Sequence, residues 1–198
     1  MDIAVTGSTG LIGTRLVRTL EGDGHRVLRL VRPDSSGTHG DTATWDPARG
    51  TIDDAALEGV DAVVHLAGVG IADSRWTDAQ KGRILRSRSA GTTLLADTLA
   101  RLQSPPAVLL SGSAIGADEQ SPSHYARSKA MGEKLALAAS PSATILRPSI
   151  VFGPEDDFFN KFAGIARISP VLPLVGGGHT GFQPVFAGDV ANAIAAAV

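Results

Sequence analysis

Cysteine is absent from this 198-residue chain, which excludes disulfide bonds, thiolate metal ligands and cysteine nucleophiles. Aromatic residues are scarce, at 5%, and Tyr125 is the sole tyrosine. No hydrophobic run reaches the ~20 residues that a membrane-spanning helix needs, and the first apolar run opens at Met1 without a charged leader before it. We therefore expect a cytoplasmic protein with no membrane span.

A strong excess of one charge is lacking as well. The formal net charge is only −2, so the sequence has no basic surplus that would indicate nucleic-acid binding. A chain of this length with 43% hydrophobic and 19% charged residues can bury a sizeable core. We expect one folded domain over residues 1–198 and predict no metal site.

Apolar runs bounded by glycine, proline or aspartate alternate with segments of helical period, which is typical of βαβ units. The expected strands are residues 2–6, 26–31, 43–45, 62–66, 107–111 and 144–147. Helices are expected to begin near residues 11, 53, 77 and 123, with the third running to about residue 102, and two more at 158–168 and 188–198. A glycine turn is expected at 176–178. The predicted fold class is α/β, a doubly wound parallel sheet (Rossmann fold) with helices on both faces and strand order 3-2-1-4-5-6.

A glycine-rich segment follows the first expected strand and leads into a helical pattern. Gly7 would let the chain turn sharply, Gly10 would let the backbone approach a pyrophosphate, and Gly13 would let the helix pack closely on the sheet. The free N–H groups and the positive end of the helix dipole would face the anion. We predict a dinucleotide-binding loop with contacts from Thr6, Gly7, Ser8, Thr9, Gly10, Leu11, Ile12 and Gly13.

Arg32 follows the second expected strand, where NAD-binding proteins usually carry an acidic residue that binds the ribose hydroxyls. A guanidinium at that place suits a 2′-phosphate instead. The sequence therefore favours NADP(H) over NAD(H) as the cofactor. The alternative for Arg32 is an ordinary solvated arginine, since Asp34 is close enough to compete as a ribose ligand.

Tyr125 and Lys129 are four residues apart on an expected helix and share one of its faces. An ammonium beside the phenol would lower the tyrosine pKa and suit it to acid–base catalysis near neutral pH. A serine at the end of the preceding strand, Ser111 or Ser113, would hold the substrate oxygen. These residues predict a catalytic set with Tyr125 as the proton-transferring group.

Other polar residues have simpler interpretations. His65 lies within an apolar strand, which favours a packed histidine over a catalytic base. Three arginines, Arg83, Arg86 and Arg88, fit the solvated face of a helix. His124 is expected at the surface.

The Gly-x-x-Gly-x-x-Gly spacing and the Tyr-x-x-x-Lys pair resemble the short-chain dehydrogenase/reductase superfamily, especially its extended and atypical members. Residues 1–112 resemble its sugar-nucleotide epimerase-like group, through Trp45-Asp46-Pro47, residues 57–68, Arg75-Trp76-Thr77, Ser87-Arg88 and Gly91-Thr92. Residues 113–198 resemble atypical members related to the NADPH-binding accessory subunit of respiratory complex I, through residues 113–118, 125–134, 147–156 and 183–190.

The resemblance implies further roles. It favours Ser113 over Ser111, because the Ala-Ile-Gly that follows Ser113 is similar to the family's segment after the active serine. It implies that Leu66, Ala67 and Gly68 pass beneath the cofactor, that Lys129 also holds the cofactor ribose, and that Pro148 and Ile150 pass by the nicotinamide. Trp45-Asp46 would contact the adenine, a buried core tryptophan being the alternative. Many extended members have an asparagine that holds a relay water where this chain has Arg88.

The function implied is hydride exchange between NADP(H) and a carbonyl or alcohol carbon of an unidentified small molecule, a nucleotide sugar being one candidate. Two alternatives stay open: a non-catalytic NADPH-binding structural or assembly protein, and a chimera joined near residues 111–113 that has no physiological reaction. Residues 148–198 would be the remnant of a substrate lobe, and an apolar face exposed there would favour homo-oligomers.

Overall fold

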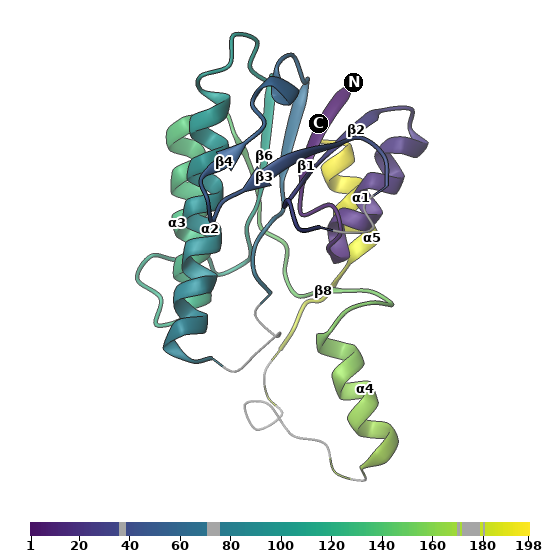
Figure 1. Ribbon diagram of the computed structural model, residues 1–198. Coiled ribbons are helices and arrows are strands. Elements are labelled where there is room, and N and C mark those ends of the chain that lie inside the picture. Colours follow the sequence, from purple (N-terminus) through teal and green to yellow (C-terminus); the bar gives the residue numbers. More distant parts are fainter. Residues whose placement is uncertain (36–38, 71–75, 170, 172–178, 180) are drawn as a thin grey trace.

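The computed structural model describes residues 1–35, 39–70, 76–169, 171, 179 and 181–198. Arg75 and the expected turn at 176–178 lie outside the described residues. At the centre of the molecule is a seven-stranded sheet of order β4-β3-β2-β1-β5-β6-β7, in which β4 pairs antiparallel with β3 and all other neighbours are parallel (Figure 1). Its strands are β1 (Asp2–Thr6), β2 (Arg26–Val31), β3 (Thr42–Asp46), β4 (Thr51–Ile52), β5 (Ala62–His65), β6 (Val108–Gly112) and β7 (Thr144–Leu146).

Two pairs of helices cover the sheet, one pair on each face (Figure 1). One face carries α1 (Leu11–Gly22) and α5 (Ala187–Ala195), and the other carries α2 (Asp78–Leu99) and α3 (His124–Ala139). Strand β1 shows why helices must cover both faces of the sheet. Its Ile3 and Val5 are buried in the core beneath α1 and α5, whereas Ala4 is buried in the opposite core beneath α2. Strands buried on both faces read as continuous apolar runs, as this one does.

The predicted fold class and strand order are confirmed, since the six predicted strands lie in the order 3-2-1-4-5-6. The sequence missed β4, a two-residue strand that turns back from β3. The helix expected near residue 53 is wrong: only a single 3-10 turn, η1 (Ala55–Leu57), forms there. Gly59 has φ +75°, a backbone conformation at which a right-handed helix cannot continue.

The entry and exit of α2 differ in how well the sequence predicted them. Thr77 caps the helix as expected, because its side chain accepts a hydrogen bond from the Gln80 N–H at 3.2 Å. The helix ends at Leu99, three residues before the predicted end. The residues that follow Leu99 form tighter turns instead, in which the N–H of Arg101 donates to the carbonyl of Thr98.

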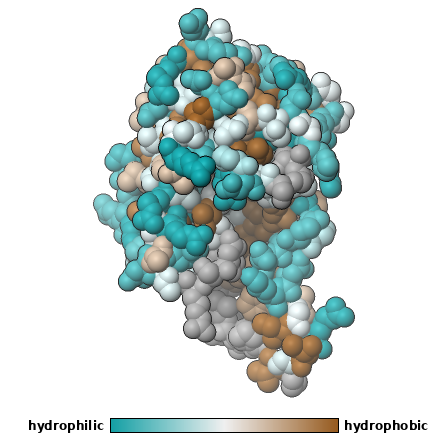
Figure 2. All heavy atoms as spheres, viewed as in Figure 1, coloured by the Kyte–Doolittle hydropathy of each residue, from teal (hydrophilic) through white to brown (hydrophobic). Residues whose placement is uncertain are grey.

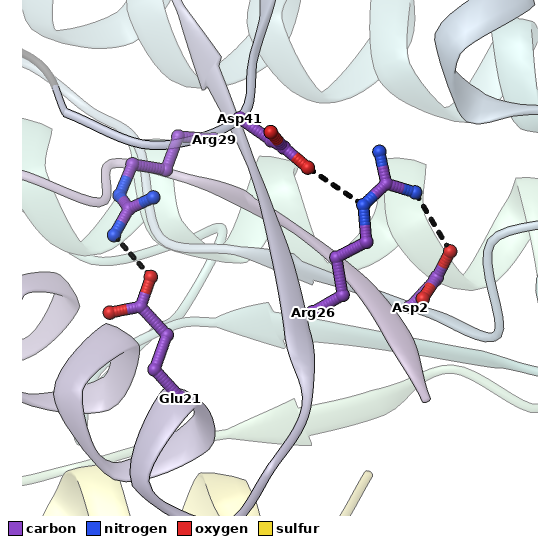
Figure 3. Close-up of polar contacts among 5 residues, drawn as sticks. All are labelled: Asp2, Glu21, Arg26, Arg29 and Asp41. Carbon is purple, nitrogen blue, oxygen red and sulfur yellow. Dashed lines mark hydrogen bonds and ion pairs between the residues drawn. The ribbon is translucent and has the colours of Figure 1, made fainter.

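Ion pairs tie β2 to its neighbours (Figure 3). Arg26 donates to Asp2 at the start of β1 and to Asp41 before β3, at 3.0 and 2.7 Å. Arg29 donates to Glu21 of α1 at 2.6 Å. The Arg26 pairs are solvent-exposed, so they contribute little to stability.

The remaining elements form a lobe beyond the carboxyl ends of the strands, made of α4 (Phe158–Ile168) and a small parallel pair, β8 (Val151–Phe152) and β9 (Val185–Phe186) (Figure 1). All six phenylalanines of the chain contact one another here: Phe152, Phe158, Phe159, Phe162, Phe182 and Phe186. No residue of α4 is buried, and Figure 2 shows hydrophobic surface at the end of the molecule where α4 lies.

No helix in the described part of the chain combines the length and the hydropathy required to cross a membrane.

Candidate functional site

The glycine loop after β1 begins with a turn that requires glycine. Gly7 has φ +70°, which side chains other than glycine rarely adopt. A Cβ there would also lie 2.9 Å from the Ala67 nitrogen and the Leu66 carbonyl carbon. The predicted sharp turn at Gly7 is confirmed, and it brings the loop against the segment that follows β5.

Gly13 is needed for close packing at the start of α1. A Cβ at this position would lie 2.1 Å from the Gly7 carbonyl oxygen, far inside contact distance. The expected close approach is therefore present, although the helix packs at this point on the loop rather than on the sheet. Gly10 is the N-cap residue of α1, and a Cβ there would lie 3.3 Å from the Gly7 carbonyl oxygen, a tight contact but a milder one than at Gly13.

The first turn of α1 has free hydrogen-bond donors. Within the part of the chain that the structure describes, the N–H groups of Leu11, Ile12 and Gly13 donate to no protein acceptor, as is usual for the first turn of a helix. Gly10 and Thr9 beside them are exposed. Free donors at the positive end of a helix dipole form a binding site for an anion such as phosphate.

Arg32 lies beside this loop because of the sheet register. Thr6 of β1 pairs with Leu30 of β2, and Ser8 and Arg32 each follow two residues later. Arg32 is exposed, as is Asp34. The structure thus places both candidate ribose ligands at the carboxyl end of β2, next to the glycine loop.

A buried network links the end of β1 to β5 and α2. The Thr6 hydroxyl accepts from the N–H groups of Leu66 and Ala67, at 3.1 and 3.2 Å, and contacts His65 Nδ1 at 2.8 Å. His65 Nε2 contacts the Thr92 hydroxyl at 3.2 Å. Thr6 is completely buried, so its side chain supports the loop from beneath, and its contact with a cofactor stays a prediction.

His65 is a packed, neutral histidine, as expected. The Thr6 hydroxyl already accepts two hydrogen bonds, so its own proton is directed to Nδ1, and Nε2–H donates to Thr92. The ring also packs edge-on against Trp45, with centroids 5.9 Å apart. Burial, with a smaller contribution from the positive charge of Lys129, lowers the His65 pKa to about 4. Trp45 is 6% exposed, which confirms the interpretation of a core tryptophan.

This shift predicts a pH-dependent stability. Between pH 4 and an unfolded-state pKa of ~6.5 the unfolded chain binds a proton at His65 and the folded chain does not, so stability is lost as the pH falls through that window. At pH 5 the loss from this group is roughly 2 kcal/mol relative to pH 7.5. Denaturant unfolding of His65→Gln should show a smaller loss between these pH values than the unmodified protein.

The matched control for this experiment is His39→Gln, which changes an exposed histidine. It should keep the full pH dependence. An equal loss of stability in both variants and in the unmodified protein would mean that His65 does not remain neutral in the fold.

Ser113 and Lys129 meet at the carboxyl end of β6, and the Tyr125 ring lies near Lys129. Ser113 follows β6 and is 6% exposed, and its Oγ makes no hydrogen bond of standard geometry with the described residues. Lys129 of α3 donates from Nζ to the Gly112 carbonyl at 3.0 Å. Nζ lies 5.9 Å from the centroid of the Tyr125 ring. Ser113 and Lys129 line one small pocket between α2, α3 and the strand ends.

The two titratable residues of this set are both shifted by burial. Burial and the neighbouring Arg88 lower the pKa of Lys129 to about 8, against a smaller opposing effect of Glu133. Burial raises the pKa of Tyr125, and the charge that opposes this is that of Arg88. The expectation that the phenol pKa would be lowered, with Lys129 as the cause, is therefore wrong for this structure, because desolvation of the phenolate outweighs the nearby cations.

Arg88 is the residue that the sequence placed wrongly. It is 8% exposed rather than solvated, and its guanidinium carbon lies 5.2 Å from the Tyr125 ring centroid. A signal for this burial exists in the sequence. Position 88 falls on the buried stripe of α2 with Ile84, Thr92 and Leu95, at helical spacing. Arg83 and Arg86 are exposed, as predicted, and so is His124.

A carboxylate that the sequence did not single out lines the same pocket. Glu133 of α3 accepts from Nε and Nη2 of Arg147 at 2.8 and 2.5 Å. The Arg147 hydrogen bond, helped by the nearby Ser113 hydroxyl and Lys129 and opposed by burial, holds the pKa of Glu133 below its usual value. The pocket is therefore lined by two positively charged side chains, Arg88 and Lys129, and by one negatively charged side chain, Glu133.

The segment after β7 connects this set to the lobe. The Pro148 carbonyl accepts from the Ile115 N–H at 3.0 Å, and the Ile150 carbonyl accepts from the Val185 N–H at 2.9 Å. Both residues are half-buried. The structure thus places Pro148 beside the loop that follows Ser113 and Ile150 beside β9 of the lobe, and their contact with a nicotinamide stays a prediction.

Comparisons with known proteins agree with this geometry. Residues 3–198 match the model of a family described as the NAD dependent epimerase/dehydratase family. The chain is 31% identical to the mitochondrial NADH dehydrogenase (ubiquinone) 1 alpha subcomplex subunit 9 of Dictyostelium discoideum, over 96% of this chain and 53% of that protein. It is 34% identical to the ceramide reductase of Caulobacter vibrioides, over 87% of this chain and 53% of the reductase.

Among solved structures, that of the human epimerase family protein SDR39U1 with NADPH has a TM-score of 0.80 and is 26% identical, covering 100% of this chain and 70% of the human chain. These findings confirm the resemblance inferred from the sequence. The chain spans about half the length of the curated relatives it matches. Because the match to the NADH dehydrogenase subunit covers nearly the whole chain, a junction near residues 111–113 is not needed to explain that resemblance.

Proposed function

The chain belongs to the NAD dependent epimerase/dehydratase family, and on that premise we propose that it binds NADP(H) and exchanges hydride with a carbonyl or alcohol carbon of a small molecule. One observation carries the proposal most directly. Ser113 and Lys129 line one pocket at the carboxyl end of β6, with the Tyr125 ring near Lys129, and the glycine loop leaves β1 at the same end of the sheet. Ligands of doubly wound sheets bind at this edge, beside the point where the strand order reverses.

The glycine loop would hold the pyrophosphate through the free N–H groups of Leu11, Ile12 and Gly13. Gly7 and Gly10 would leave room for the phosphates, and Ser8 and Thr9 would complete the loop. A bound nicotinamide ring would supply or accept the hydride. Leu66, Ala67 and Gly68 would pass beneath the cofactor, and Pro148 and Ile150 would flank its nicotinamide end.

The proton is handled by this chain's own residues. Tyr125 would donate it to, or accept it from, the substrate oxygen. Ser113 has a buried hydroxyl that makes no hydrogen bond of standard geometry with the described residues, and it would orient that oxygen. Lys129 would donate to a cofactor ribose hydroxyl. Its ammonium has three donors, and one of them bonds the Gly112 carbonyl at the end of β6.

Arg32 is the basis for preferring NADP(H). Its exposed guanidinium beside the glycine loop is suited to a 2′-phosphate, to which charge-assisted hydrogen bonds form. Arg32→Asp should therefore weaken NADPH binding relative to NADH by about tenfold to a hundredfold, or ~1.4 to ~2.7 kcal/mol. Calorimetric titration of both cofactors measures this ratio.

Arg101→Asp is the control with the same change of charge. Arg101 is exposed and follows the end of α2. It lies near the amino ends of the strands, at the end of the sheet opposite the glycine loop. It should leave the NADPH to NADH ratio unchanged. A ratio that is equal in both variants and in the unmodified protein would assign the ribose contact to another residue, with Asp34 the first candidate.

A second candidate function is a non-catalytic NADPH-binding subunit. It is favoured by the 31% identity to a subunit of NADH dehydrogenase over 96% of this chain. It is also favoured by the raised pKa of Tyr125, which opposes proton transfer near neutral pH. Following NADPH oxidation across a panel of ketones and aldehydes separates the two functions, because only the enzyme would consume NADPH in a carbonyl-dependent way.

A further inference from the structure

Arg88 lies over the face of the sole tyrosine and is held there rigidly. Its guanidinium carbon is 5.2 Å from the centroid of the Tyr125 ring. Nη1 donates to the Ile84 carbonyl of its own helix, and Nη2 donates to the Val69 carbonyl after β5, both at 3.2 Å. A buried guanidinium with two anchoring bonds presents a fixed charge to the phenol ring.

The approach of Arg88 depends on a glycine in the opposite segment. A Cβ at Gly68 would lie 3.3 Å from the guanidinium carbon, which is closer than nearly all such contacts. Nε of Arg88 is buried and, within the described ranges, has no hydrogen-bond partner. One donor of the guanidinium, Nε, therefore has no partner among the described residues, although burying a charged group without hydrogen bonds is costly.

Lys129, the other cation near the phenol, is less well placed. It is 5.9 Å from the ring centroid, and its ammonium is bonded to the Gly112 carbonyl. Its own pKa is lowered to about 8, mainly by burial, so it loses charge in mildly alkaline solution. An arginine keeps its charge throughout that range.

We propose that Arg88 is a positioning residue that acts through Tyr125, its fixed charge stabilising the phenolate and so making the hydroxyl proton transferable. The chemical use of this effect rests on the proposed function, in which Tyr125 transfers the proton. The charge effect itself needs neither cofactor nor substrate.

Several titratable or charged groups face this site from the elements packed around it. They are Arg88 from α2, Lys129 and Glu133 from α3, His65 from β5 and Arg147 after β7, with the exposed His124 next to Tyr125 on its own helix. Only a comparison of variants within this fixed surrounding isolates the contribution of Arg88.

The experiment is a spectroscopic titration of phenolate absorbance, which reports Tyr125 alone because the chain has no other tyrosine. Arg88→Gln should raise the Tyr125 pKa by about one unit. Arg88→Met, which keeps the aliphatic stem and buries no new polar group, should raise it likewise and serves if the glutamine variant does not fold. Arg88→Lys should restore most of the original value, since it restores the charge.

The matched control is Arg86→Gln, two residues away on the exposed side of α2. It should leave the Tyr125 pKa unchanged. If Arg88→Gln or Arg88→Met titrates as Arg86→Gln does, the proposal is overturned and Arg88 is a structural residue only. Circular dichroism at each pH keeps the comparison to folded protein.

This outcome is separable from that of the proposed function. A raised Tyr125 pKa in the neutral variants together with no NADPH binding would sustain the proposal about Arg88 and reject the function. Unchanged titration together with NADPH-dependent turnover would do the reverse.

Discussion

Gly13→Ala is expected to lower the affinity for NADPH at least a hundredfold, or by ~2.7 kcal/mol. The new methyl carbon would lie 2.1 Å from the Gly7 carbonyl oxygen. A backbone oxygen cannot swing away as a side chain end can, so the loop must move by about 1 Å from the start of α1. The N–H groups of Leu11 and Ile12 would then no longer converge with the loop on one anion. Calorimetric titration with NADPH measures the loss.

The matched control is Gly22→Ala in the same helix. Gly22 is the last residue of α1 and does not have a positive φ, and among the described residues an added Cβ would meet no atom within 4 Å outside its chain neighbours and its own helix backbone. Alanine should be neutral there or slightly stabilising, because glycine disfavours helix by at most ~1 kcal/mol.

The unfolding free energy of Gly13→Ala should fall by about 1–3 kcal/mol through overpacking. NADPH affinity preserved in Gly13→Ala would place the cofactor away from the loop.

Tyr125→Phe is expected to lower kcat/KM for any carbonyl substrate about 10²-fold to 10⁴-fold, the range for loss of a general acid. The substitution removes only the hydroxyl, and the ring contacts with Arg88 and Lys129 remain available. NADPH affinity should therefore stay nearly the same. Steady-state rates with calorimetric affinities for the same preparations separate the two effects.

The variant therefore has an internal control in cofactor binding. A drop in both turnover and NADPH affinity would indicate a disturbed site rather than a lost proton donor. Turnover equal to that of the unmodified protein would remove Tyr125 from the mechanism and assign the proton transfer to another group.

The parts of the fold that the sequence predicted share a local cause. Gly7 and Gly13 could be predicted because a turn at φ +70° and a 2.1 Å approach admit no side chain, so the requirement is visible in the residue type itself. The Thr77 cap is equally local, since its partner is three residues away. The strand order followed from the alternation of apolar runs and helices, which permits few arrangements.

What the sequence missed depends on contacts between distant residues. Arg88 looked like part of a solvated row with Arg83 and Arg86, and its burial results from packing against Gly68 and Tyr125, which lie on other elements. The Tyr125 pKa was predicted from the four-residue spacing to Lys129 alone. Burial, which no spacing reveals, reversed its direction. The failed helix near residue 53 shows a different limit, because one turn is too short for a periodic pattern.

The central claim is that the glycine loop binds a nicotinamide dinucleotide, and the most direct test is calorimetric titration of the purified protein with NADPH and, separately, with NADH. The account predicts saturable binding of one molecule per chain, tighter for NADPH than for NADH, and strongly weakened in Gly13→Ala but not in Gly22→Ala. Absence of binding by either cofactor would contradict the account and would leave the glycine loop with a structural role alone.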